Sequence, residues 1–342
     1  MRALVLSKGY ELSVDNVPIP AIKDNEVLIK IKSVGICGSD VHGFKGTTGR
    51  RIPPVIMGHE LSGVIEKKGK NSSFKIGDRI AVNSTIYCGQ CLECNLGHFS
   101  ICSNRKVIGV SCSEYSRDGG MAEYISLPDH IVYELPDNVS FDEAALLEPC
   151  SVALHAVSKI NIPKNKLLLV FGAGTIGLLI THMLKMKGYE NIYIVDKINS
   201  RLDIALKMGA TKKVLWDESM LNENSFQLEH STLIDCIIDA VGTSDSLNAG
   251  IKMINRRGLI RLVGNTMGRV DFPLQDVVTK EIILKGSYAF NDEMSECISF
   301  MEQKKIDVKP LISKIIDLEK APYWFKRLSE NDTEIVKVII RL

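Results

Sequence analysis

The chain has 342 residues, which is the length of about two domains. Hydrophobic residues make up 45% of it, charged residues 24%, and the formal net charge is +1. This composition is that of a globular protein and gives no sign of a basic surface for nucleic acid or membrane. Because a chain of this size can bury its cores without disulfides or metals, any metal is expected to have a local role.

The cysteine count and the N-terminus bear on the cellular compartment. The apolar run at the N-terminus is too short for a signal peptide, so we expect a cytoplasmic protein. Residues 167–184 contain no Asp, Glu, Lys or Arg, but three glycines, two threonines and a histidine favour a strand, a turn and a buried helix over a membrane span. The nine cysteines, an odd number, favour metal binding or catalysis over disulfides.

Residues 1–150 are predicted to form a β-rich domain. Residues 26–34 alternate like a strand with one buried face, and β-branched runs at 62–67 and 79–83 predict further short strands. Turn residues separate them, as at 77–78 and 118–120. Many short strands with turns favour a barrel-like or sandwich-like β domain.

From residue 140 the pattern changes to helices that alternate with strands. Ser140-Phe-Asp-Glu is a capping-box pattern, and residues 144–159 look helical. Strands are predicted at 166–171, 191–195, 213–216, 235–239 and 259–263, with helices at 175–187, 200–208 and 244–255. This alternation predicts an α/β fold with a doubly wound parallel sheet over residues 151–288. Residues 289–342, with a helix at 292–304 and a strand at 334–341, are expected to pack back on the first domain.

Gly172, Gly174 and Gly177 form a GxGxxG turn that follows a predicted strand and opens a helix. The first two glycines permit a tight turn and close approach to a pyrophosphate, and the third allows close helix packing. The helix N-terminus adds free N–H groups and a partial positive charge. The alternative is an ordinary glycine turn in a sheet that binds nothing.

Asp196 ends the next predicted strand, 19 residues after Gly177. Its carboxylate suits the adenosine ribose hydroxyls and repels a 2′-phosphate, which favours NAD over NADP. Lys197 and Arg201 weaken that preference, because a nearby base can accommodate the phosphate. The predicted NAD contacts are Gly172, Gly174, Thr175, Ile176, Gly177, Asp196, Arg201, Val241 and Val263.

Four cysteines lie within fifteen residues, at Cys88, Cys91, Cys94 and Cys102. Four thiolates can surround one tetrahedral zinc ion with no open position, so this lobe, at about residues 86–104, is predicted to hold a structural zinc. An iron–sulfur cluster is the chemical rival, but its pattern continues with a closer fourth cysteine followed by proline. Unliganded thiols are the other alternative.

Further metal-ligating residue types occur at Cys37, His59, Glu60 and Glu148, and their spacing alone does not predict a site. However, the motifs GICGSDVHGF, PPVIMGHELSGVI, GDRIAV, CGQCLECNLGHFSIC, DGGMAEYI, ALLEPCSVALHA, VFGAGTIGLL and DAVG occur in this order. The chain therefore resembles the zinc-containing medium-chain dehydrogenases along essentially its whole length. The resemblance is nearest to the sorbitol, xylitol and sugar-alcohol-phosphate branch, because Glu148 stands where the ethanol-oxidising branch typically has cysteine.

The resemblance implies a GroES-like catalytic domain followed by a Rossmann-like NAD domain. It implies a second, catalytic zinc held by Cys37, His59 and a carboxylate, with Glu60 or Glu148 as the direct ligand and the other near a bound water. Ser39 and His42 would relay the proton of the substrate hydroxyl towards solvent; the alternatives are a turn hydroxyl and a surface histidine. Zinc acts as a Lewis acid on the hydroxyl, and NAD accepts the hydride.

The predicted activity is oxidation of a secondary alcohol on a polyol, sugar alcohol or sugar-alcohol phosphate. The alternatives are a threonine, amino-alcohol or hydroxy-acid dehydrogenase and a non-catalytic NAD-binding redox sensor. Lys45, Arg50 and Arg51 are candidates for gripping a substrate phosphate or carboxylate. A small-molecule substrate is expected, with neither nucleic acid nor membrane as partner. A homodimer or homotetramer is expected to form by pairing strands near residues 274–285.

Overall fold

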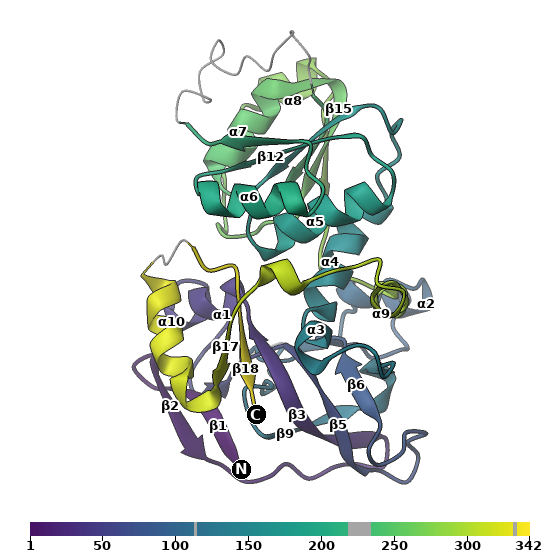
Figure 1. Cartoon of the computed structure of the whole chain (residues 1–342), viewed down its shortest axis with the longest axis vertical. Helices are drawn as coiled ribbons and strands as arrows, with labels where there is room; N and C mark the ends of the chain where they lie inside the picture. Colours follow the sequence, from purple (N-terminus) through teal and green to yellow (C-terminus); the bar gives the residue numbers. More distant parts are fainter. Residues whose placement is uncertain (113–114, 218–233, 331–333) are drawn as a thin grey trace. The chain divides into compact units, whose positions relative to one another are not determined.

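The computed structural model describes residues 1–112, 115–217, 234–330 and 334–342 (Figure 1). The chain divides into two compact units. Unit 1 consists of Met1–Ser151 and Ala289–Leu342, and unit 2 of Val152–Tyr288. Within the described ranges, no helix combines the length and apolar character that crossing a bilayer requires.

Unit 1 is built mainly on antiparallel strands. These are β1 (Arg2–Ser7), β2 (Glu11–Asn16), β3 (Glu26–Ile36), β4 (Val55–Ile56), β5 (Glu60–Lys68), β6 (Arg79–Val82), β7 (Thr85–Ile86), β8 (Lys106–Val107), β9 (Tyr124–Pro128), β10 (Val132–Glu134), β17 (Ile312–Asp317) and β18 (Lys337–Arg341). The largest sheet has the order β10-β6-β5-β3-β18-β17, and β9 also pairs with β3. The strands predicted at 26–34, 62–67 and 79–83 are therefore confirmed as parts of β3, β5 and β6.

The C-terminal segment completes this sheet. Strand β18 lies between β3 and β17 and pairs antiparallel with β3, with Val338 opposite Ile36 and Ile340 opposite Val34. Helix α10 (Ala321–Ser329) buries Trp324 and Phe325 in the same hydrophobic core. The last residues of the chain thus lie beside its first long strand, as Figure 1 shows for β18 and β3.

The other helices of unit 1 are short. They are α1 (Gly38–Phe44), α2 (Leu92–Asn95), α3 (Phe141–Ala144), α9 (Glu293–Glu302) and the 3-10 turns η1 (Phe99–Ile101), η2 (Asp129–Ile131), η4 (Lys309–Leu311) and η5 (Leu318–Lys320), while α4 (Leu147–Ser158) runs on into unit 2. The capping box at Ser140 is confirmed, because its hydroxyl accepts from the Glu143 N–H and the Glu143 carboxylate accepts from the Ser140 N–H. The helix predicted at 144–159 is largely confirmed as α4, which begins three residues later, at Leu147. Pro149 has no N–H to continue the helical bonding back to Ala145, and two separate helices form.

Unit 2 is a six-stranded parallel sheet with helices. Its strands are β11 (Leu167–Phe171), β12 (Asn191–Asp196), β13 (Lys212–Leu215), β14 (Ile234–Asp239), β15 (Ile254–Leu262) and β16 (Ile283–Gly286), and its helices are α5 (Thr175–Met186), α6 (Asn199–Lys207), α7 (Ser244–Met253) and α8 (Leu274–Thr279). The strand order is β13-β12-β11-β14-β15-β16 with every pair parallel. The predicted doubly wound sheet is confirmed. Its strand order reverses between β11 and β14, where such sheets bind ligands at their carboxyl ends.

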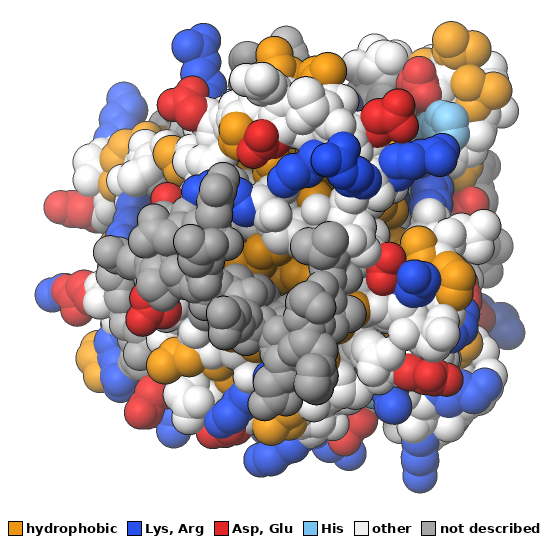
Figure 2. Space-filling view, turned by 90° about the horizontal axis from the view of Figure 1, so that it is seen from above, with side chains coloured by type: hydrophobic (Ala, Val, Ile, Leu, Met, Phe, Trp, Pro, Cys, Tyr) orange, Lys and Arg blue, Asp and Glu red, His pale blue; other side chains and the backbone are white. Residues whose placement is uncertain are grey.

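Residues 274–285 were expected to contain strands, and this is wrong for their first half. Pro273 precedes helix α8 and fixes a backbone angle that suits a helix start. Within residues 274–285, the strand begins only at Ile283, with β16, which forms one edge of the parallel sheet. On the face drawn in Figure 2, Lys and Arg side chains are interspersed with Asp and Glu side chains, in keeping with the net charge of +1.

Candidate functional site

The four predicted cysteines of the lobe between β7 and β8 converge. The Sγ atom of Cys102 lies 3.5 Å from that of Cys88 and 3.8 Å from that of Cys91, and all four sulfurs, including Cys94, lie within 4.8 Å of one another. A tetrahedral zinc with Zn–S bonds of about 2.3 Å requires sulfur separations of about 3.8 Å. The four sulfurs therefore fit one closed zinc site in both spacing and chemistry.

The surroundings of the cluster favour metal binding. The backbone N–H of Gln90 is the main group that lowers the pKa of Cys88, to about 6, whereas burial raises the pKa of Cys94 to about 12. A cation among the sulfurs would favour the thiolate at both positions. The apolar side chains of Leu92 and Leu96 are 70% and 60% exposed, so they give the lobe little core of its own.

A second group of donor atoms forms where β3, α1 and β5 meet. Cys37 directly precedes α1, and Glu60 begins β5 opposite Gly35 of β3. The thiol of Cys37, the imidazole of His59 and the carboxylate of Glu60 offer ligand atoms within 4.8 Å of one another. These are a soft thiolate, an imidazole and a carboxylate, a donor set that suits a catalytic zinc with a fourth position open.

Glu148 lies near this group but is held differently. It is buried on α4, and its Oε1 atom accepts a 2.7 Å hydrogen bond from Ser84 Oγ. Burial raises the pKa of Glu148, and the neighbouring charge of Glu60 adds to the rise while His59 opposes it. Among the described residues, the group within 4.8 Å contains Glu60 and does not extend to Glu148.

Asp40 fixes the surroundings of Cys37 and His59. It is fully buried, its Oδ1 atom lies 2.8 Å from Arg51 Nη2 and 3.5 Å from His59 Nδ1, and its Oδ2 accepts from the Cys37 N–H at 3.2 Å. Burial acts to raise the pKa of Asp40, but His59 and Arg51 outweigh it and hold that pKa well below its usual range. A charged carboxylate behind a ligand histidine orients the ring and strengthens it as a ligand.

Arg51 was considered as a substrate-anion contact, and the structure contradicts this. Its side chain is 4% exposed and donates to Asp40 and, at 3.1 Å, to Ser39 Oγ. The guanidinium is therefore committed to a buried ion pair. Lys45 and Arg50 are exposed.

Lys337 is a site residue that the sequence analysis missed. Its Nζ atom lies 2.9 Å and 2.7 Å from the two carboxylate oxygens of Glu60, and both side chains are 2% exposed. Burial alone would lower the pKa of Lys337, but the charge of Glu60 outweighs it and the pKa is raised. No local pattern could reveal this pair, because 277 residues separate its members.

Ser39 and His42 lie on α1, just after Cys37, and both are half-buried. Burial lowers the pKa of His42 below its usual 6.5, and the charge of Lys45 lowers it further. The imidazole is therefore neutral near pH 7 and able to accept a proton. The Ser39 hydroxyl accepts from Arg51, which leaves its own proton available for donation.

The glycine turn of unit 2 has the geometry of a phosphate-binding loop. Gly172 has a φ of +92°, which favours glycine, and a Cβ atom on Gly177 would lie 1.7 Å from the Gly172 carbonyl oxygen. A Cβ atom on Gly174 would meet no protein atom within 4 Å. The turn leaves this side open, and α5 begins immediately after it with Thr175 and Ile176 in its first turn.

Three of the other predicted NAD residues lie at or just after the carboxyl ends of neighbouring strands. Asp196 ends β12, and its two oxygens accept from the N–H groups of Ala173 at 2.6 Å and Ile198 at 2.9 Å. A carboxylate has about four acceptor positions, so about two remain for a ribose. Val241 and Val263 follow β14 and β15, and Arg201 lies on α6.

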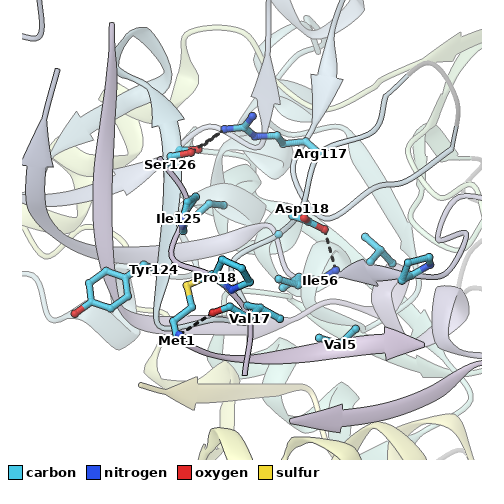
Figure 3. A pocket seen from close by; sticks show the side chains of 14 residues that line it. Met1, Val5, Val17, Pro18, Ile56, Arg117, Asp118, Tyr124, Ile125 and Ser126 are labelled. Atoms are coloured by element: carbon cyan, nitrogen blue, oxygen red, sulfur yellow. Dashed lines mark hydrogen bonds between the residues drawn. The ribbon is translucent and has the colours of Figure 1, made fainter. Parts of the chain in front are cut away.

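A cavity of about 410 Å³ lies elsewhere in unit 1 (Figure 3). Its polar groups bond to one another: the Met1 ammonium donates to the Val17 carbonyl at 2.8 Å, and Asp118 Oδ1 accepts from the Ile56 N–H at 3.1 Å. Arg117 is likewise turned onto Ser126. The residues of the two donor groups do not line this cavity, so it is not the candidate active site.

The sequence matches two protein families, described as alcohol dehydrogenase GroES-like domain over residues 23–137 and zinc-binding dehydrogenase over residues 175–303. It is 32% identical over 335 residues to D-xylulose reductase A of Aspergillus oryzae, a match that covers 94% of this chain and 92% of the relative. The chain belongs to the zinc-dependent medium-chain dehydrogenases. The predicted family, fold class and enzyme class are confirmed.

Two further relatives of this dehydrogenase are informative. Sorbitol dehydrogenase of Bacillus subtilis is 29% identical over 345 residues, covering 99% of this chain and 97% of the relative. The crystal structure of an alcohol dehydrogenase (RspB) from Escherichia coli CFT073, complexed with NADH, superposes with a TM-score of 0.90. The two chains are 26% identical, with 100% of this chain and 99% of the other covered.

Proposed function

We propose that this dehydrogenase oxidises a secondary alcohol of a polyol, sugar alcohol or sugar-alcohol phosphate and transfers the hydride to NAD. The observation that carries the proposal is the meeting of Cys37, His59 and Glu60 donor atoms within 4.8 Å. Unit 1 is then the catalytic domain, with its structural lobe at about residues 86–104, and unit 2 is the NAD domain.

The chain is proposed to hold two zinc ions. The structural ion would be held by the four cysteines of the lobe, Cys88, Cys91, Cys94 and Cys102. The catalytic ion would be held by Cys37 and His59, with a carboxylate from Glu60 or Glu148. When bound, the catalytic zinc supplies Lewis acidity for the substrate hydroxyl, and NAD supplies the hydride acceptor. Asp40 keeps the His59 ring in place through its charge, and Arg51 keeps Asp40 in place.

Proton removal is assigned to the residues of α1. Ser39 lies two residues after Cys37, and its hydroxyl proton can pass towards solvent as it takes up that of the substrate. The lowered pKa of His42 suits an acceptor that is neutral at pH 7 and passes the proton on.

NAD binding is assigned to the glycine turn and the strand ends beside it. The open side of Gly174 and the N-terminus of α5, with Thr175 and Ile176, suit a pyrophosphate. Asp196 suits the ribose, with Arg201 nearby in sequence, and Val241 and Val263 are proposed to lie against the cofactor. The NADH in the related crystal structure supports a nicotinamide cofactor here.

The names of the curated relatives support the substrate class. D-xylulose reductase and sorbitol dehydrogenase are both named for polyols or their ketoses, and each match covers more than nine-tenths of both chains. A threonine dehydrogenase would use the same donor set, and a non-catalytic NAD-binding sensor would use the same fold. Neither has an observation in its favour.

A homo-oligomer and a cytoplasmic location are also proposed. Among the described strands, β16 pairs with β15 alone and so forms an edge of the sheet, and Ile283 on it is 54% exposed. Leu274 and Val278 of the adjoining helix α8 are 63% and 65% exposed. An open edge beside exposed apolar side chains suits strand pairing across a dimer or tetramer interface. Light scattering that finds a monomer at micromolar concentration would exclude this.

A substrate panel tests the proposed function. NADH formation is measured with polyols, sugar-alcohol phosphates, threonine and simple alcohols. Oxidation of a polyol or its phosphate, with a kcat/KM at least about tenfold above that for threonine, is expected. Activity on threonine alone would keep the chemistry and replace the substrate. Inactivity throughout, with zinc and NAD bound, would favour a non-catalytic role.

A further inference from the structure

Arg261 lies in the interior of unit 2, on β15 between β14 and β16. Its side chain is 1% exposed, and its Nε and Nη1 atoms are buried without a hydrogen-bond partner among the described residues. A guanidinium keeps its charge in a protein, and a charge buried without a partner is strongly unfavourable. The position of Arg261 therefore calls for a negative charge beside it.

The described parts of the neighbouring strands place no acidic side chain against Arg261. Its register partners, whose side chains lie on the same face of the sheet, are Ile238 on β14 and Lys285 on β16. Asp239 is next to Ile238 and so lies on the opposite face, where it accepts three hydrogen bonds. Asp235 pairs at 3.5 Å with a lysine just before β11. Both aspartates of β14 are thus engaged elsewhere.

The thiol of Cys236 is the ionisable group that acts on Arg261. Burial lowers the pKa of Arg261, and Cys236 opposes this shift. Burial raises the pKa of Cys236 to about 12, which outweighs the opposite effect of Arg261. The thiol is therefore neutral at pH 7 and does not balance the charge of the guanidinium.

We propose that Arg261 binds a small monovalent anion, such as chloride, inside unit 2. One guanidinium requires one negative charge, and its N–H groups can donate to the ion. A water molecule would accept these hydrogen bonds but leave the charge unbalanced. The neighbouring Cys236 and Ile238 are fully buried and add no strong donor for an oxyanion such as phosphate. The proposal concerns unit 2 alone and does not depend on zinc, NAD or the substrate.

Urea unfolding in two salts tests the proposal. The chain has two tryptophans, Trp216 in unit 2 and Trp324 in unit 1, so in a Trp324→Phe background the fluorescence of Trp216 reports on unit 2. The full-length protein is unfolded in equal concentrations of sodium chloride or sodium methanesulfonate, whose anion is much larger than chloride. Chloride at about ten times its dissociation constant should lower the unfolding equilibrium constant by about tenfold.

Two arginine variants in this background identify the site. Arg261→Met should lose the difference between the salts, and in methanesulfonate it should be more stable than its parent, because a buried unbalanced charge is removed. Arg256→Met is the matched control, since Arg256 is exposed on the same strand, and it should keep the chloride effect. Equal stability of the parent in the two salts, or a chloride effect that persists in Arg261→Met, would overturn the proposal.

Bromide locates the ion directly, even if Arg261→Met does not fold. Bromide replaces chloride and gives an anomalous diffraction signal, so crystals of the wild type grown in sodium bromide should show a peak beside the Arg261 guanidinium. A wild type without this peak would overturn the proposal. Neither experiment involves zinc, NAD or turnover, so the anion site and the proposed function can fail independently.

Discussion

A Cβ atom on Gly177 would lie 1.7 Å from the carbonyl oxygen of Gly172, so the turn closes only because Gly177 has no side chain at this contact. Gly177→Ala is therefore expected to disrupt the turn itself, with a loss of several kcal/mol, about 3 or more, in the free energy of unfolding. Gly174→Ala is the matched comparison, because its Cβ atom meets nothing. It should keep the wild-type melting temperature and weaken NAD binding at least about tenfold, by blocking the pyrophosphate. Calorimetry measures the stability of the two variants, and NAD titration measures their affinity for the cofactor. Equal melting temperatures for Gly177→Ala and Gly174→Ala would contradict the steric argument.

Asp196 is expected to determine the choice between NAD and NADP. Asp196→Ala removes the acceptor proposed for the ribose and the bonds to Ala173 and Ile198. The KM for NAD should rise at least about tenfold, while the KM for NADP falls or stays constant, because the repulsion of a 2′-phosphate is gone. Steady-state kinetics with both cofactors measure this. An unchanged ratio of the two kcat/KM values would remove Asp196 from the ribose site.

Cys91→Ser should affect stability without directly changing the chemistry. Loss of one of four thiolates weakens a closed structural site, so zinc retention by the lobe should fall at least about tenfold and the melting temperature with it. The folded fraction should keep its kcat. Cys112→Ser, at a half-buried cysteine outside the cluster, is the control and should match the wild type. A normal melting temperature for Cys91→Ser would argue against a structural zinc.

Asp142 gives a pH-dependent contribution to stability. It accepts from Ser33 Oγ at 2.6 Å and from Arg341 Nε at 3.1 Å, joining the start of α3 to β3 and β18. Burial acts to raise the pKa of Asp142, but Arg341 and Ser33 outweigh it and the pKa is lowered. Because the folded-state pKa is the lower one, the stabilisation is fully present above the usual value of 3.8 and is lost as the pH falls through the folded-state pKa.

The variant Asp142→Asn should therefore lower the free energy of unfolding by about 1 kcal/mol at pH 7. The difference in free energy of unfolding between this variant and the wild type should shrink as the pH falls below about 4. Denaturant unfolding at several pH values measures this. Asp137→Asn, whose side chain is fully exposed, should show no such dependence. A difference for Asp142→Asn that stays constant down to pH 3 would contradict the assignment.

The sequence predicted the local chemistry better than the long-range contacts. The four-cysteine cluster (Cys88 to Cys102) and the glycine turn (Gly172 to Gly177) are compact motifs. Folding only has to close a short loop to bring the residues of each motif together. The alternation of strands and helices likewise specified the parallel sheet, because that pattern has few other ways to bury its apolar faces.

The features that the sequence did not predict depend on pairing between distant segments of the chain. Lys337 reaches Glu60 only because β18 is placed beside β3, and a single lysine in an apolar strand carries no local sign of a buried partner. Arg51 was a candidate contact for a substrate anion, yet it turns inward to Asp40. In both cases the tertiary fold determined which charges pair, and the charge pattern along the chain did not.

Zinc at Cys37 and His59 is proposed to enable oxidation of a polyol by NAD. The most direct measurement is NADH formation from sorbitol or xylitol, before and after removal of the catalytic zinc by chelation and again after zinc is restored. Activity should fall at least about a thousandfold and return with zinc, because Lewis-acid catalysis contributes several kcal/mol. Cys37→Ser should remain inactive when zinc is added, while it still binds NAD. Full activity in the zinc-depleted enzyme, or in Cys37→Ser, would exclude a catalytic role for zinc at this site.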